Sequence, residues 1–101
     1  MEPHQQLRAI RERAGVTQNG LAQETGLSHA YVWRVEAGRA KLTARDTIHG
    51  WARALQVHPD EIYQAIGVIP HDITDLLAES TPETWRLVRQ LIHRFNDIDR
   101  E

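Results

Sequence analysis

The stretch from Thr17 to Gly38 constrains the fold of this 101-residue chain most, because it encodes two short helices in close succession. A hydroxyl residue that can cap a helix precedes each of them, Thr17 before the first and Ser28 before the second. Gly26 ends the first helix, and Gly38 suits the left-handed backbone that closes the second. Apolar residues at helical spacing can join the two helices; they are Leu21, Ala22, Leu27, Val32 and Val35. We therefore expect two packed helices joined by a tight turn.

The second of these helices has an outer face that its apolar stripe leaves free. The residues on this face are His29, Ala30, Trp33 and Arg34. Two short packed helices with such a face are typical of a helix-turn-helix, whose second helix enters the major groove of DNA. The segment therefore predicts that double-stranded DNA is a partner of this chain.

Helical spacing extends over the rest of the chain and strand signals are absent, so the predicted fold class is all-α. The first helix carries Leu7, Ile10 and Ala14 at helical spacing. The predicted helices cover residues 3–14, 17–25, 28–37, 43–55 with Thr43 as its cap, 59–66, 72–79, and a last one that starts at Thr81-Pro82. We thus expect a five-helix DNA-binding domain over residues 1–67 and a two-helix C-terminal extension over residues 68–101.

Charge is divided unevenly along the chain, although its net value is only −2. Residues 1–58 hold eight Arg or Lys and five acidic residues, a net charge of +3. Residues 59–101 hold four Arg and nine acidic residues, a net charge of −5. This asymmetry favours a basic N-terminal part that faces DNA and an acidic C-terminal part that does not.

Composition argues against a membrane protein, a metal site and an enzyme. The chain has no cysteine, no apolar run that approaches the roughly 18 residues of a membrane span, and no secretion signal at its N-terminus, so we expect a cytoplasmic protein. Its six histidines lack the spacing of metal ligands. Ser28 and His29 are adjacent and point about 100° apart on a helix, which disfavours a nucleophile pair. We expect no cofactor and no catalytic activity.

Four stretches between Leu7 and Ile62 resemble the phage repressor and Cro-like helix-turn-helix family, often called the XRE family. They read L-R-A-I-R-E-R-A-G-V-T-Q, L-A-Q-E-T-G-L-S, V-W-R-V-E-A-G and W-A-R-A-L-Q-V, in this order. The resemblance covers a little over half of the chain and implies a compact five-helix domain. It also implies a homodimer that binds DNA and regulates transcription, with a repressor at a pseudo-palindromic operator as the favoured form.

The same resemblance implies roles for individual residues. The positions that match base-facing ones are His29, Ala30, Trp33 and Arg34, and Arg34 has the donors to fork onto guanine O6 and N7. Arg11 and Glu36 match an internal ion pair between the first and third helices. The residues expected at DNA phosphates are Gln18, Asn19, Tyr31, Arg39, Lys41 and Arg45.

Two aromatic residues have alternative interpretations. Trp33 either contacts DNA or packs within the protein, and DNA is favoured because Val32 and Val35 already fill the inward stripe. Tyr31 either flanks the DNA backbone or packs against the preceding helix, and the sequence does not separate the two.

The last helix carries an apolar stripe with two interpretations of its own. Its members recur at steps of three and four residues; they are Trp85, Val88, Leu91, Ile92 and Phe95. The stripe either folds back on the five-helix domain or meets its counterpart in a second chain, and the dimer is favoured because a palindrome needs two symmetric readers. The helix over residues 59–66 is the competing dimer interface.

A protein-interaction module is the alternative function. In that hypothesis the chain is the antitoxin of a toxin–antitoxin pair, whose acidic helical tail covers a basic protein partner while the front end binds DNA and regulates its own gene.

Overall fold

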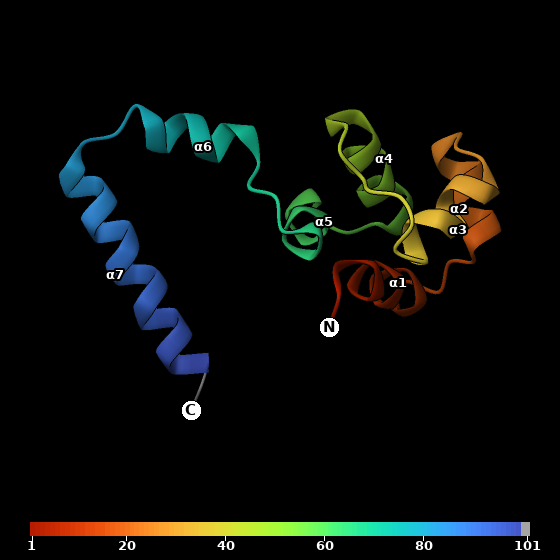
Figure 1. The fold of residues 1–101 in the computed structure, drawn as a ribbon, viewed down its shortest axis with the longest axis horizontal. Helices are drawn as coiled ribbons and strands as arrows, with labels where there is room; N and C mark the ends of the chain where they lie inside the picture. Colours follow the sequence, from red (N-terminus) through yellow and green to blue (C-terminus); the bar gives the residue numbers. More distant parts are fainter. Residues whose placement is uncertain (100–101) are drawn as a thin grey trace. The chain divides into compact units, whose positions relative to one another are not determined.

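The computed structural model contains seven helices and no strand within residues 1–99, so the predicted all-α fold class is confirmed (Figure 1). It describes the backbone of residues 1–99 and the side chains of residues 1–96. The chain divides into two compact units, Met1–Ile69 and Pro70–Glu101. The helices of the first unit are α1 Pro3–Arg13, α2 Gln18–Thr25, α3 His29–Glu36, α4 Arg45–Leu55 and α5 Pro59–Ile66, and those of the second are α6 His71–Ala78 and α7 Pro82–Asp99.

In the first unit α4 packs against both α2 and α5, α1 packs against α3 and α5, and α2 packs against α3. The periodic apolar residues of all five helices meet in one core, as their spacing predicts. The largest side chains that are completely enclosed in it are Leu21, Val32, Val35, Ile48, Trp51 and Ile62. This core fixes α2 and α3 against the rest of the unit and leaves the outer side of α3 uncovered.

The predicted caps of α2 and α3 are confirmed. The Thr17 hydroxyl oxygen accepts a hydrogen bond from the Gly20 amide at 3.0 Å, and the Ser28 hydroxyl oxygen accepts one from the Tyr31 amide at 3.0 Å. Each bond satisfies a first-turn N–H that the helix itself cannot pair. The two hydroxyl residues therefore set where α2 and α3 begin.

The predicted cap of α4 is wrong, and some predicted helix ends differ from the structure by one residue. Thr43 does not cap α4, which starts at Arg45 after Ala44 and has no side-chain cap. Leu42 is buried in the core, and the backbone is not helical through Ala44, whose carbonyl oxygen accepts the first helical hydrogen bond, from the Ile48 amide. Thr43 therefore lies one residue before the cap position. The helix α1 ends at Arg13 rather than at Ala14, α3 ends at Glu36 rather than at Ala37, and α6 spans His71–Ala78 rather than 72–79.

Two glycines should respond in opposite ways to the same added methyl group. Gly26 closes α2 with φ +73°, a left-handed backbone that strains any other residue, so Gly26→Ala should lower the free energy of unfolding by about 1 kcal/mol. Gly50 lies inside α4, and a Cβ there would meet nothing closer than the Arg53 guanidinium at 3.9 Å. Gly50→Ala should therefore raise the free energy of unfolding by about 0.5–1 kcal/mol. Urea denaturation followed by circular dichroism measures both; a shift of the same sign in the two variants would contradict this expectation.

The second unit buries no side chain among those described. Among the described residues one side-chain hydrogen bond joins the two helices: the Trp85 indole N–H of α7 donates to the Leu77 carbonyl oxygen of α6. Large apolar side chains are exposed on both helices; they are Ile73, Leu76, Trp85, Leu87, Leu91, Ile92 and Phe95. No helix in the described part of the chain is both long and apolar enough to cross a bilayer.

Candidate nucleic-acid interface

The outer face of α3 presents four neighbouring side chains to solvent. His29, Ala30, Trp33 and Arg34 are all exposed and follow one another at the spacing of a single helical face. Val32 and Val35 point the opposite way and are completely buried. Because the inner face is anchored in the core, the outer face is held in a fixed orientation.

The C-terminal end of α3 is tied to α1 by a buried ion pair. The Arg11 guanidinium donates from Nε to Glu36 Oε2 at 2.6 Å and from Nη2 to Glu36 Oε1 at 2.9 Å, and its Nη1 donates to the Val16 carbonyl oxygen. The hydrogen bonds from Arg11 to Glu36 raise the pKa of the guanidinium above its ordinary value, although burial alone would lower it. Both partners belong to the framework that holds α3, and neither faces solvent.

Gln18 connects this ion pair to the outer face of α3. Its amide nitrogen donates to Glu36 Oε1 at 3.1 Å, and its amide oxygen lies 3.2 Å from His29 Nε2. The side chain that the sequence assigns to a phosphate is thus already engaged on both sides. The second hydrogen of its amide nitrogen and the amides of the α2 N-terminus are the groups left for an anion.

The loop after α3 is fastened to the first unit. Tyr31 is half-buried against the core, and its hydroxyl donates to the Lys41 carbonyl oxygen at 3.3 Å. The backbone amides of Arg39 and Ala40 both donate to the Arg34 carbonyl oxygen, at 2.8 and 3.2 Å. Lys41 therefore extends from an anchored backbone. The ring of Tyr31 therefore packs against the core, and its hydroxyl holds the loop.

The structure brings Trp33 and Arg39 together, a contact that the sequence did not indicate. The Arg39 guanidinium carbon lies 5.5 Å from the centre of the Trp33 ring, a cation–π arrangement. Trp33 keeps 47% of its surface exposed. The pair forms a flat, cationic surface at the end of the outer face of α3.

The basic side chains around α3 make no ion pair with an acidic residue among the described residues. These are Arg34, Arg39, Lys41 and Arg45, all of them exposed. No acidic residue occurs between Glu36 and Asp46, so the positive charge of the loop is locally unbalanced. Arg45 and Asn19 lie on the first turns of α4 and α2 rather than on α3. The arrangement can therefore attract a polyanion to the side of the unit where α3 is exposed.

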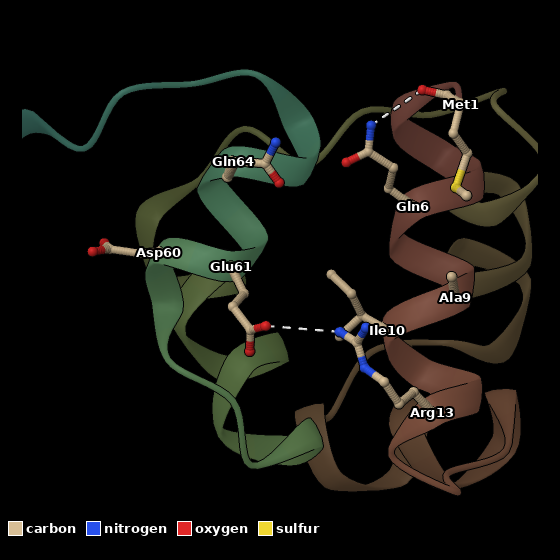
Figure 2. A pocket seen from close by; sticks show the side chains of 8 residues that line it. All are labelled: Met1, Gln6, Ala9, Ile10, Arg13, Asp60, Glu61 and Gln64. Atoms are coloured by element: carbon tan, nitrogen blue, oxygen red, sulfur yellow. Dashed lines mark hydrogen bonds and ion pairs between the residues drawn. The ribbon is translucent and has the colours of Figure 1, made fainter. Parts of the chain in front are cut away.

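A separate groove lies between α1 and α5, where the competing dimer interface was expected. It has a volume of about 480 Å³, with Ala9 and Ile10 on one wall and polar side chains of α5 on the other (Figure 2). Figure 2 shows Arg13 extending across it toward Glu61, with 3.7 Å between the charged atoms. None of the residues expected to contact DNA lines this groove.

Comparison with known proteins agrees with this geometry. No curated protein matches the chain. The family model described as "Helix-turn-helix domain" matches residues 5–64, which span α1 to α5 and include the paired helices α2 and α3. The match covers more than half of the chain. The protein therefore belongs to the helix-turn-helix domain family.

Proposed function

We propose that this protein is a sequence-specific regulator of transcription of the phage repressor and Cro-like (XRE) kind. It acts as a repressor, and two copies read a pseudo-palindromic operator with α3 of each in the major groove. The observation that carries the proposal is the exposed face of α3, which is flanked by unpaired cations of the loop that follows it. A helix that reads bases needs such a face, and phosphates on either side of the groove need such cations.

Selection of bound DNA from a random pool tests this function directly. Enrichment of a two-fold symmetric sequence is the expected result, because each copy contributes one α3 and the half-sites lie about one helical turn apart. A protein that enriches no sequence would overturn the proposal.

Arg34 and Lys41 should separate base reading from phosphate binding. Arg34→Ala should remove about 1–3 kcal/mol of discrimination at one base pair while leaving binding to unrelated DNA nearly unchanged. Lys41→Ala should weaken binding to all sequences alike and reduce the salt dependence by about one phosphate contact. Fluorescence anisotropy on operator and scrambled duplexes at several salt concentrations measures both variants. Unaltered operator discrimination in Arg34→Ala would show that the assignment of the outer face of α3 is wrong.

The proposed dimer forms through the apolar stripe of α7. An 8-residue helix and an 18-residue helix with no buried side chain up to residue 96 are marginal in isolation, so the second unit needs a covering surface. A second copy of the same unit supplies one, since its stripe offers equally large apolar side chains. The two helices also differ in charge: α6 carries Asp72 and Asp75, whereas the first three turns of α7 carry Arg86 and Arg89 besides Glu83, so α6 of one copy beside α7 of the other would bring opposite charges together.

Ile92 is the stripe residue to test, and Gln90 is its matched control on the opposite face of α7. Ile92→Glu places a charge in the proposed interface and removes apolar burial, so it should raise the dissociation constant of the dimer by about a hundredfold or more. Gln90→Glu adds the same charge outside the interface and should leave the dimer intact. Sedimentation equilibrium distinguishes them. A monomeric wild-type protein, or an Ile92→Glu protein that dimerises normally, would overturn the proposed interface.

The acidic character of α6 favours a second candidate, an antitoxin-type module. Asp72, Asp75 and the neighbouring Glu79 lie beside exposed Ile73 and Leu76, and a basic partner protein would complement both features. Stoichiometric co-purification with the product of an adjacent gene, from cells that express both, would support this candidate.

A further inference from the structure

The hydrogen bonds around Gln18 can run in only one direction. Glu36 offers only acceptor oxygens, because Arg11 holds it as a carboxylate, so the group of Gln18 that lies 3.1 Å from it must be the donating NH₂. The amide oxygen of Gln18 then faces the other way, toward His29 Nε2 at 3.2 Å. An amide oxygen can only accept, and therefore His29 Nε2 must carry the hydrogen.

This direction fixes the tautomer of a side chain on the outer face of α3. In a neutral imidazole one ring nitrogen is a donor and the other is an acceptor. With Nε2 donating to Gln18, the acceptor of neutral His29 is Nδ1. His29 is the first residue of α3 and is exposed. Its Nδ1 has no hydrogen-bond partner among the described residues.

We propose that His29 reads DNA as a hydrogen-bond acceptor and that Gln18 is the positioning residue that makes it one. The inference rests on the proposed function, in which the outer face of α3 meets base edges. In the major groove the donors are the exocyclic amino groups, N6 of adenine and N4 of cytosine. Guanine offers only O6 and N7 there, and thymine offers O4, so these acceptors meet the lone pair of Nδ1 unfavourably. His29 therefore selects an amino-bearing base.

The buried ion pair of Arg11 and Glu36 influences which base His29 selects, and it does so through Gln18. Arg11 neutralises Glu36, Glu36 orients the amide of Gln18, and the amide sets the proton of His29. Sequence preference at one base is thereby linked to two buried residues that lie outside the exposed face of α3. Gln18→Ala removes the link and frees both tautomers of His29, while Gln23→Ala makes the same change on an exposed part of α2 and serves as its control.

The first test needs no DNA. Nitrogen-15 correlation spectra of the free protein, recorded at about pH 8 so that imidazoles are neutral, report which ring nitrogen of His29 carries hydrogen. Protonation at Nε2 is expected in the wild-type protein and in Gln23→Ala, and a mixture of both tautomers in Gln18→Ala. Protonation at Nδ1 in the wild type would overturn the inference whatever the protein does with DNA.

The second test uses base analogues in the sequence recovered from the random pool. Each adenine is replaced by purine and each cytosine by 2-pyrimidinone, which removes the amino group and keeps the ring. At one position of each half-site the replacement should weaken wild-type binding by about tenfold or somewhat less, as expected for one neutral hydrogen bond, and should have no effect on His29→Ala. Loss of this selectivity in Gln18→Ala, but not in Gln23→Ala, would support the positioning role.

The outcomes distinguish the role of His29 from the function of the whole protein. If the protein selects a sequence but no amino-group deletion depends on His29, the acceptor role is overturned and the proposed function stands. If the protein selects no sequence at all, both are overturned, although the tautomer measured in the free protein would still hold.

Discussion

Arg11→Met is expected to lower the free energy of unfolding of the first unit by about 3–5 kcal/mol, because it leaves the Glu36 carboxylate buried without its counter-ion. The Glu36 side chain is only 2% exposed, and both of its oxygens accept hydrogen bonds from the guanidinium. Such a loss is a large part of the total stability of a unit of this size. Urea denaturation of wild type and variant, followed by circular dichroism, measures it.

A second ion pair of α1 provides the control. Arg8 and Glu12 also stand 2.6 Å apart, but their side chains are 64% and 54% exposed, so Arg8→Met should cost less than about 1 kcal/mol. The double variant Arg11→Met with Glu36→Leu removes both buried charges and should recover much of the loss, although Gln18 then loses a partner. Equal effects of Arg8→Met and Arg11→Met would show that burial does not determine what each ion pair contributes to stability.

Trp51→Ala is expected to cost about 3–5 kcal/mol, since the indole of Trp51 is fully enclosed and its removal opens a large cavity beside α4. Thermal and urea denaturation both report the change. Trp51→Phe should cost less, for two reasons. It fills most of the space, and it removes an indole N–H that has no hydrogen-bond partner among the described residues.

Trp33→Ala is the matched control, because it deletes the same side chain from an exposed site. It should change the free energy of unfolding by less than about 1 kcal/mol and should weaken DNA binding instead. A Trp33→Ala protein that is as unstable as Trp51→Ala would show that Trp33 is a packing residue.

Features of the fold that depend on a few neighbouring residues were predictable from the sequence. The caps of α2 and α3 each involve a hydroxyl and an amide three residues away, so Thr17 and Ser28 identify them without knowledge of the rest of the chain. The start of α4 was not predictable in this way. Thr43 has the right side chain for a cap, but Ala44 takes the cap position, two residues after Leu42, whose burial depends on residues distant in the chain.

The same distinction applies to the candidate site. Helical periodicity predicted which side of α3 faces outward, because the buried Val32 and Val35 fix its rotation. The pairing of Arg11 with Glu36 was available only from the family resemblance. The stacking of Arg39 on Trp33 depends on the path of a loop that no periodic pattern describes. The link from Gln18 to His29 joins two helices through side-chain rotamers, which a sequence does not specify.

The chain's three tryptophans occupy three different environments, and they make the protein its own optical probe. Trp51 is enclosed in the core of the first unit. Trp33 is exposed on α3, with the Arg39 guanidinium over its ring, and Trp85 lies on the α7 stripe with its indole N–H donating a hydrogen bond to α6. Indole emission shifts with the polarity around the ring and is quenched by stacked bases. Single-tryptophan versions that keep one of these residues, with phenylalanine at the other two, would therefore follow unfolding, DNA binding and association as separate fluorescence signals without any attached dye.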